Sequence, residues 1–351
     1  MPKAELPIAQ NACDLPSASS NELCVLHYEP GSFGPRLPVS IFVISGATHI
    51  LTANVLVSGV SGPIGAALQA RLRSEKCRVV RLVRRATTGE REIAWDPAQS
   101  IDPQSVSGFD AVIHLAGETI VGRWTEAKKA RIRDSRILGT RNLAGALAAA
   151  TARPRVLVCA SAIGFYGDRG EEILREDSGP GTGFLPDVCR EWEKATQGAA
   201  EAGIRTVNVR IGLVLSPLGG ALPKMLTPFR LGLGGKIGDG RQWWSWIEVN
   251  DLASAIWHAI QRDSLHGPVN AVAPKPVTNA EFTKTLASVL ARPAIFPMPA
   301  LAARLAFGQM ADELLLSSQR VEPAKLLASG FLFQHSDLRG ALNAILGRGQ
   351  K

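Results

Sequence analysis

Cysteine is scarce in this sequence, and its placement excludes two common uses of the residue. The 351 residues include five cysteines, an odd number, and no two have the short spacing of a metal-binding motif. They are Cys13, Cys24, Cys77, Cys159 and Cys189. A disulfide-stapled secreted domain and a cysteine metal site are therefore not expected. The pattern predicts a protein of a reducing compartment, without disulfides or a bound metal.

Long hydrophobic runs are also lacking. The one extended apolar stretch, residues 40–60, is interrupted by Gly46, His49, Thr52 and Asn54. A membrane span would have to bury these residues, whereas two strands joined by a turn would not. The first ten residues, MPKAELPIAQ, lack the basic segment and apolar core of a secretory signal. We expect a cytoplasmic protein that does not associate with membranes.

The charge is not concentrated in any one stretch. The formal net charge is +8, from 39 Lys and Arg against 31 Asp and Glu. These basic residues are scattered along the chain, which favours a solvated basic surface over a nucleic-acid partner. Part of the excess suits a phosphorylated cofactor.

The order of predicted elements indicates the fold class. Residues 1–38 are rich in Pro, Ser, Asn and Gly without periodicity, which predicts a flexible tail within an N-terminal extension over residues 1–50. From Asn54, apolar strands alternate with helices, the pattern of a parallel sheet covered on both faces. The predicted strands are NVLVSG, CRVVRLVRR, REIAWD, FDAVIHLAG, RVLVCAS and RTVNVRIGLVL. We predict an α/β protein with a Rossmann-type, doubly wound parallel sheet.

The composition changes after Ser216. Residues 217–250 are rich in Gly and Trp, which predicts a lid-like insertion in an α/β domain that spans 51–272. A smaller, mixed C-terminal region on the substrate side is expected over 273–351. Two helix starts carry capping signals: Thr125 as an N-cap, and a capping box at Thr278 and Glu281.

A glycine array follows the first strand of this domain. VLVSGVSGPIG places Gly59, Gly62 and Gly65 between a strand and a helix. The first glycine permits a tight turn, the second lets the backbone approach a pyrophosphate, and the third allows close packing of helix on strand. With Ser61, Pro63 and Ile64, these residues form a predicted dinucleotide-binding loop. The alternative is a glycine-rich turn without a ligand.

The end of the next strand indicates which dinucleotide is bound. A carboxylate there would bind the two ribose hydroxyls of NAD, but this sequence has Arg84 and Arg85 instead. Two guanidinium groups offer charge-assisted hydrogen bonds to a 2′-phosphate, which favours NADP(H). The alternative is a pair of surface arginines at the end of a strand.

Further motifs identify a family. The glycine array, HLAGE, SAIGFYGDRG, RIGLVL, GDGRQWWSWIEVNDL and MADELLLSSQRVEPAKLL together resemble the epimerase-like, atypical short-chain dehydrogenase/reductase family. The likeness runs from about residue 54 to about residue 346. It implies an NAD-dependent epimerase/dehydratase-like domain followed by a C-terminal domain of unknown function. We further expect the cofactor to be contacted by Leu115, Ala116, Gly117, Arg136 and Arg210.

The sequence departs from the extended relatives at their catalytic positions. In those relatives a Ser or Thr orients the substrate oxygen, a Tyr transfers a proton, and a Lys four residues later lowers the pKa of that Tyr. Here Ser161 is present, although a strict count places the hydroxyl position at Ala162. The Tyr position holds Leu185, or Phe184 if the helix shifts by one, and the Lys position holds Cys189.

The candidate catalytic residues are therefore Ser161, Tyr166 and Cys189. A thiol is no cation, so Cys189 cannot replace the electrostatic effect of a lysine. It is either an acid or nucleophile near a helix start or a small packing residue. Tyr166, one of only two tyrosines, is either the proton donor or a stacking wall for the substrate. Arg136 replaces the structural Asn of the family's preceding helix.

Other residues are weaker candidates. An anionic substrate would suit Lys224, Arg230 and Arg241, and a sugar-like one would suit stacking on Trp243 and Trp246. Glu118 is a further possible acid or base, and Asp251 is expected to be a helix N-cap rather than a catalyst.

Two functional hypotheses follow. The first is an NADP(H)-dependent oxidoreductase or epimerase that acts on a small-molecule carbonyl or hydroxyl substrate, as a monomer or homodimer. The second is a non-catalytic NADP(H)-binding redox sensor or regulator, since some members of the family carry a cell-division-inhibitor label. The Trp-rich segment and the retained Ser161 favour the enzyme.

Overall fold

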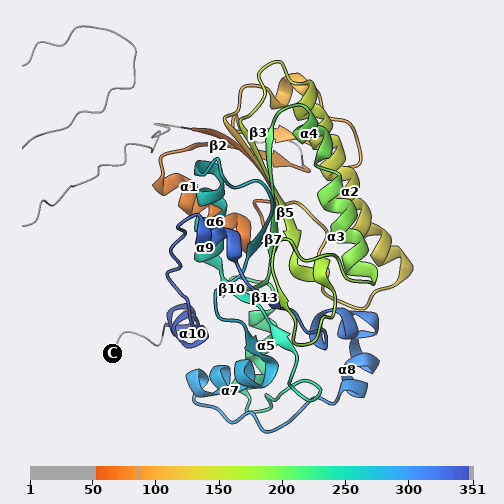
Figure 1. The fold of residues 1–351 in the computed structure, drawn as a ribbon, viewed down its shortest axis with the longest axis vertical. Coiled ribbons are helices and arrows are strands. Elements are labelled where there is room, and N and C mark those ends of the chain that lie inside the picture. Colours follow the sequence, from red (N-terminus) through yellow and green to blue (C-terminus); the bar gives the residue numbers. More distant parts are fainter. Residues whose placement is uncertain (1–52, 86, 88, 348–351) are drawn as a thin grey trace, which may run out of the picture. The chain divides into compact units, whose positions relative to one another are not determined.

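The computed structural model describes residues 53–85, 87 and 89–347. Its centre is a seven-stranded sheet in the order β11-β7-β5-β4-β1-β2-β3, in which every neighbouring pair is parallel (Figure 1). The predicted doubly wound parallel sheet is thereby confirmed. The strands are β1 (Asn54–Ser58), β2 (Arg78–Val83), β3 (Glu92–Ala94), β4 (Ala111–His114), β5 (Val156–Ala162), β7 (Arg205–Ile211) and β11 (Gly267–Ala271). The expectations for residues 1–50 lie outside the described residues.

Helices cover both faces of the sheet, which explains why its strands are apolar on both sides (Figure 1). In β1, Val55 and Val57 pack in one buried cluster and Leu56 in another, because successive side chains of a strand point to opposite faces. One face is covered by α1 (Pro63–Ser74), α6 (Val249–Gln261) and α9 (Ala324–Ala328). The other is covered by η1 (Pro103–Val106), α2 (Glu126–Ala149), α3 (Phe184–Lys194) and α4 (Gln197–Glu201).

A second core lies beyond this sheet. Trp244, Trp246 and Phe282 are buried there among aliphatic side chains of three helices. Those helices are α5 (Leu222–Arg230), α7 (Asn279–Leu290) and α10 (Leu338–Leu346). Short strands complete the region: β6 (Ile173–Leu174), β8 (Leu213–Leu215), β9 (Trp243–Trp244), β10 (Trp246–Glu248), β12 (Val277–Thr278) and β13 (Arg320–Val321). The remaining elements are η2 (Ile163–Tyr166), α8 (Ala300–Phe307) and η3 (Ala311–Leu315).

The strand predicted for RTVNVRIGLVL is divided at Gly212. Its first part, β7, belongs to the central sheet, whereas β8 pairs with β10. A Cβ at Gly212 would lie 2.6 Å from the carbonyl oxygen of Ser245, so only glycine permits this close approach. The division places β8 and β10 between the two cores.

The capping signals have mixed outcomes. Thr125 caps α2, and Thr278 with Glu281 forms a capping box on α7, as predicted. The prediction that Asp251 is an N-cap is wrong. Glu248 is the N-cap of α6, and the buried Asp251 carboxylate accepts hydrogen bonds from the backbone N–H groups of residues 334 and 335.

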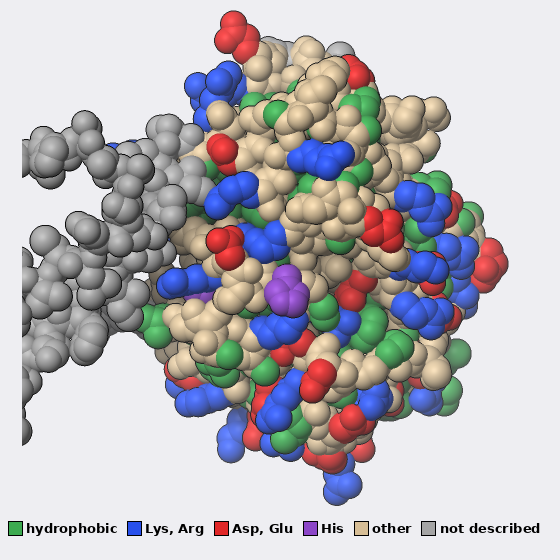
Figure 2. Space-filling model, turned by 45° about the horizontal axis from the view of Figure 1, so that its top comes forward, with side chains coloured by type: hydrophobic (Ala, Val, Ile, Leu, Met, Phe, Trp, Pro, Cys, Tyr) green, Lys and Arg blue, Asp and Glu red, His purple; other side chains and the backbone are tan. Residues whose placement is uncertain are grey.

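The surface and the thiols can be compared with the composition. On the face in Figure 2, basic and acidic side chains are interspersed. Among the described residues, Cys77, Cys159 and Cys189 are free thiols. Within the same part of the chain, no helix combines the length and the apolar character that crossing a bilayer requires.

A buried histidine, His114, ends β4, directly before the loop Leu115–Gly117. The Nδ1 atom of His114 lies 2.6 Å from Ser58 Oγ, and the edge of its ring meets Trp95. Burial lowers the pKa of His114 to about 4. The folded protein therefore holds this imidazole neutral under conditions in which an unfolded chain would protonate it.

We predict a stability loss in mild acid that depends on His114. Because its folded pKa lies below the unfolded value of about 6.5, stability is complete above pH 6.5 and falls as the pH drops toward 4. The loss attributable to this residue reaches about 2–3 kcal/mol near pH 4.5. Urea unfolding at pH 7 and pH 4.5 measures it, with His114→Gln as the comparison. Equal pH dependence in both proteins would contradict the assignment.

Candidate functional site

In the glycine loop between β1 and α1, one glycine has free space where a side chain would lie, and the other two do not. A Cβ at Gly59 would lie 2.6 Å from the carbonyl carbon of Leu115, and one at Gly65 would lie 2.5 Å from the carbonyl oxygen of Gly59. Around Gly62, by contrast, a Cβ would meet nothing within 4 Å. Gly59 and Gly65 therefore serve the packing of the loop, and Gly62 faces free space.

The start of α1 adds polar groups to this free space. Gly62 is the N-cap of the helix and supplies no side chain, so the backbone N–H groups of the first turn have no capping partner. The loop also lies at the switch point of the sheet, since β1 is flanked by β2 on one side and β4 on the other. An uncapped helix start with an open glycine fits the phosphates of a dinucleotide.

The loop after β4 lies beside the glycine loop. Gly59 packs against Leu115 and Ala116, and Gly117 faces the guanidinium group of Arg136 from α2. Arg136 Nη1 donates to the carbonyl oxygen of Glu118 at 2.9 Å. The structure thus brings together most of the predicted cofactor residues, namely Gly59, Ser61, Gly62, Pro63, Ile64, Gly65, Leu115, Ala116, Gly117 and Arg136.

The two arginines after β2 differ in their surroundings. Arg85 Nη2 lies 2.8 Å from Glu92 Oε1, and the same buried carboxylate pairs with Arg81 at 2.6 Å. The side chain of Arg84 is exposed, and no ion pair engages it within the described part of the chain. Arg84 is therefore the freer of the two predicted phosphate ligands.

Arg210 forms an internal ion pair with Glu193, and Ser161 is hydrogen-bonded to the same carboxylate. The Arg210 guanidinium donates to both carboxylate oxygens of Glu193, at 2.8 and 2.9 Å, and Ser161 Oγ donates to the same carboxylate at 2.7 Å. Arg210 also stacks on Phe165, with its Cζ 3.5 Å from the ring centroid. Both predicted residues are buried. Their contacts do not support direct roles for Ser161 with a substrate or for Arg210 with a cofactor.

Tyr166 belongs to the same buried network. Its hydroxyl accepts from Arg210 Nη1 at 2.9 Å and lies 2.7 Å from Asn270 Oδ1 and 2.9 Å from the carbonyl oxygen of Arg175. The single hydroxyl hydrogen is therefore directed at an internal acceptor. Burial raises the pKa of Tyr166. This geometry does not support the expected role of Tyr166 as proton donor, and the fully buried ring cannot be a substrate wall either.

Cys189 is buried on α3, one turn after Leu185. Both side chains pack against the 3-10 helix η2, close to Gly164. Burial raises the pKa of Cys189 to about 12, and the nearby Glu193 carboxylate acts in the same direction. The thiol is therefore protonated at neutral pH, which fits a packing residue and not a nucleophile.

Three weaker candidates also have other roles. Lys128 Nζ donates to Glu118 at 2.6 Å, and this hydrogen bond lowers the pKa of the Glu118 carboxyl, which makes it a poor acid. Trp246 is fully buried in the second core, so it is not a substrate-stacking face. Trp243 is held by Glu171 and covered by Arg320. By contrast, Lys224, Arg230 and Arg241 are exposed.

A cavity of about 280 Å³ lies beside Leu185, the residue that the resemblance assigns to the family's tyrosine position. Leu185 and Pro186 of α3 form part of its wall, together with Gly164, Gly167 and Thr182. The opposite wall comes from the C-terminal region. This wall is mostly polar and comprises Arg304, Asp312, Glu313, Leu316 and Ser317. Asp168, which lies earlier in the chain, also lines the cavity.

Sequence analysis missed two carboxylates: Glu193, which binds Ser161 and Arg210, and Glu313, which lines the cavity. Glu193 lies four residues after Cys189, and this helical spacing is the signal that could have placed it on the same face of α3. Glu313 lies within the motif MADELLLSSQRVEPAKLL, but no local pattern shows that it reaches α3. Across the described residues, no cluster of three or more His, Cys, Asp or Glu side chains could hold a metal ion.

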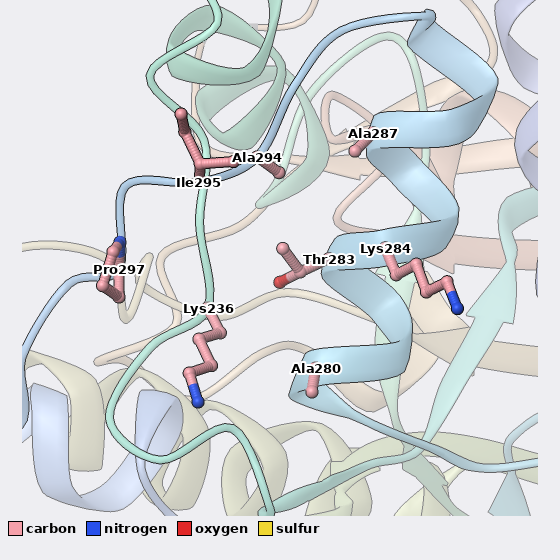
Figure 3. A pocket seen from close by; sticks show the side chains of 8 residues that line it. All are labelled: Lys236, Ala280, Thr283, Lys284, Ala287, Ala294, Ile295 and Pro297. Atoms are coloured by element: carbon pink, nitrogen blue, oxygen red, sulfur yellow. The ribbon is translucent and has the colours of Figure 1, made fainter.

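A second cavity, of about 410 Å³, lies away from these groups, between α7 and residues 294–297 (Figure 3). Ala280, Thr283 and Ala287 project from α7 toward that segment, whereas Lys284 points away from it. Its lining is mostly apolar: Lys236, Ala280, Thr283, Lys284, Ala287, Ala294, Ile295 and Pro297. None of the predicted site residues contributes to it.

Comparison with known proteins agrees with this architecture. The chain is 44% identical to the epimerase family protein Mb2239 of Mycobacterium bovis over 292 residues, which covers 83% of this chain and 96% of that protein. It is 36% identical to the human epimerase family protein SDR39U1 over 296 residues, or 83% and 99% of the two chains. A crystal structure of human SDR39U1 (isoform2) with NADPH superposes with a TM-score of 0.78, at 35% identity, over 84% and 99% of the chains.

Two sequence families match consecutive parts of the chain. The NAD dependent epimerase/dehydratase family matches residues 55–272, and a domain of unknown function, DUF1731, matches residues 298–345. The first match covers most of the central sheet and the candidate site, and the second covers the opposite wall of the 280 Å³ cavity. This chain therefore belongs to the NAD dependent epimerase/dehydratase family.

Proposed function

We propose that this chain binds NADP(H) and moves a hydride between it and a small carbonyl or hydroxyl compound. The observation that carries the proposal is the open position at Gly62 beside the uncapped start of α1, at the switch point of the sheet. The human relative that was crystallised with NADPH supports the choice of cofactor. Bound NADP(H) would supply or accept the hydride at its nicotinamide ring.

The chain's own residues would hold the cofactor at three places. The backbone of Ser61–Gly65 binds the phosphates, and the loop Leu115–Gly117 lines the adjacent groove. Arg84 binds the 2′-phosphate, with Arg85 held beside it by Glu92. The cofactor-binding part of the proposal rests on the α/β domain.

Arg136 would supply the positive charge that Cys189 cannot. Its guanidinium lies next to Gly117 and over the ring of Trp192, with the Cζ atom 5.0 Å from the ring centroid. Its electrostatic interaction with Cys189 lowers the pKa of that thiol, although burial dominates and raises it. In this proposal the cation of the site comes from α2, whereas the resemblance to the extended relatives implies a lysine on α3.

The substrate would occupy the 280 Å³ cavity beside Leu185. This volume is at the small end of ligand pockets, which suits a small molecule. Since Ser161, Tyr166 and Cys189 are all engaged or buried, we propose that none of them transfers the proton directly. Water that enters the cavity, oriented by its carboxylates, would carry the proton. The same arrangement would serve an oxidoreductase or an epimerase.

A second function is favoured by one observation. All three side chains expected to be catalytic are buried, two of them within a closed hydrogen-bond network. A protein that binds NADP(H) as a redox sensor or regulator would need no acid or base at this position. An oxidoreductase differs from the sensor in consuming NADPH, whereas an epimerase converts its substrate without net consumption of the cofactor.

We predict that Gly62→Asp stabilises the protein and weakens NADPH binding. Asp is a favourable N-cap at the extended backbone of Gly62, whereas its charge repels the phosphates. Fluorescence titration should show at least a tenfold lower affinity for NADPH, and the melting temperature should not fall. Gly145→Ala, at another open glycine, is the control. Unchanged NADPH affinity in Gly62→Asp would contradict the assigned loop.

Turnover separates the two functions. Wild-type protein is incubated with NADPH and a panel of small aldehydes and ketones, and absorbance at the nicotinamide band is followed. Consumption of several equivalents of NADPH, abolished in Gly62→Asp, supports the oxidoreductase. Tight binding of NADPH without consumption across the panel counts against the oxidoreductase and leaves the sensor and the epimerase.

We predict that Arg84→Ala reduces the preference for NADPH over NADH. Loss of one charge-assisted hydrogen bond should weaken NADPH by about 1–3 kcal/mol and leave NADH nearly unchanged. Arg78→Ala is the matched control, because Arg78 is an exposed arginine at the other end of β2. Isothermal titration with both cofactors measures the effect. An equal loss for NADPH and NADH would exclude the 2′-phosphate role.

We predict that Cys189 resists alkylation in the native protein. With a pKa of about 12, its thiolate population at pH 8 is negligible, and the side chain is buried. Iodoacetamide at pH 8 should label the partly exposed Cys77 first and label Cys189 only after unfolding. Peptide mass spectrometry gives the extent at each cysteine. Rapid native labelling of Cys189 would restore it as a candidate nucleophile.

A further inference from the structure

Helix α3 begins without a cap of its own. Its N-cap residue, Gly183, has no side chain and a φ of +128°, a conformation that glycine adopts readily and other residues rarely do. The first backbone N–H groups of the helix therefore need acceptors from elsewhere. This start also carries Leu185, which lines the 280 Å³ cavity.

The acceptor comes from the C-terminal domain. Glu313 in η3 accepts hydrogen bonds from the backbone N–H of Phe184 at 3.2 Å and from that of Leu185 at 2.7 Å. Gln309 Nε2 donates to the same carboxylate at 2.7 Å. One carboxylate thus provides both the capping oxygens and the negative charge that a helix start favours.

The segment around Glu313 is fixed on both sides. Before it, Met310 Sδ accepts from the backbone N–H of Gly122 at 3.3 Å. After it, the backbone N–H of Ser318 donates to Asp168 Oδ1 at 3.0 Å, and β13 pairs with β6. Glu313 is therefore held against α3 by contacts that do not involve α3.

The effect of this cap reaches the cofactor loop through α3. The helix carries Cys189 and Trp192, and the Trp192 ring supports Arg136, which lies against Gly117. A shift of the first turn would move the cavity wall at Leu185 and the surface on which Arg136 rests.

We propose that Glu313 is a positioning residue of the candidate site. Through Glu313, the DUF1731 domain caps α3 and holds that helix against the 280 Å³ cavity and the cofactor loop. The link between this role and NADP(H) depends on the proposed function, whereas the capping of α3 by Glu313 does not depend on it. This role gives the domain of unknown function a task at the site, beyond forming the opposite wall of the cavity.

The test measures the cap and the cofactor separately. Hydrogen exchange by mass spectrometry on the full chain follows the peptide over residues 183–189, without cofactor, in Glu313→Ala and Glu313→Gln. NADPH affinity is measured on the same proteins at 20 °C, where circular dichroism confirms that they are folded. Asp337→Ala is the control, because Asp337 caps α10 in the same domain, does not line the cavity and makes no hydrogen bond to α3 among the described residues.

In Glu313→Ala we expect exchange of this peptide to be about tenfold faster and NADPH affinity to be about fivefold lower. Glu313→Gln, which keeps one acceptor oxygen, should recover most of both losses, and Asp337→Ala should match the wild type. Should Glu313→Ala fail to fold, the comparison is made between Glu313→Gln and the wild type, with smaller changes in the same direction.

Two results would overturn the proposal. Unchanged exchange in Glu313→Ala would mean that the carboxylate does not cap α3. Faster exchange with unchanged NADPH affinity would mean that the cap does not position the site. A wild-type protein that binds no NADPH would instead refute the proposed function, and the exchange data would still decide whether Glu313 caps the helix.

Discussion

The ion pair between Arg210 and Glu193 is the interaction on which the candidate site depends. It joins β7 to α3 inside the protein, and it collects Ser161 and Tyr166 into one hydrogen-bonded group. Removal of one partner of such a buried pair typically costs about 3–5 kcal/mol, because the other charge is left without compensation. The orientation of α3, and with it the positions of Leu185 and Cys189, is therefore set by electrostatics as well as by packing.

The charged groups of the site come from unexpected elements. Residues at the family's catalytic positions are apolar or engaged in the interior, whereas the cation beside Gly117 is Arg136 of α2 and the carboxylate beside Leu185 is Glu313 of the C-terminal domain. Such a site is identified from contacts between residues that lie far apart in the sequence, because the residue types along α3 do not indicate it.

Local patterns in the sequence predicted the parallel sheet, the glycine loop and the caps at Thr125 and Thr278, because each depends on residues a few positions apart. They did not predict that Asp251 would bind the backbone at 334 and 335, or that Trp246 would be core. The burial of Tyr166 and Arg210 was not predicted either. Their partners, Asn270 and Glu193, are brought to them by the sheet and by α3, and no spacing along the chain reveals such partners.

The cap on α3 also has a consequence for the order in which the molecule is assembled. Glu313 lies 129 residues after Phe184, so α3 emerges from the ribosome long before its capping carboxylate. During synthesis the seven strands can pair while the first turn of α3 still has free N–H groups. Completion of the cavity then waits for the segment that contains η3 and β13. The sheet can therefore form before the pocket is complete.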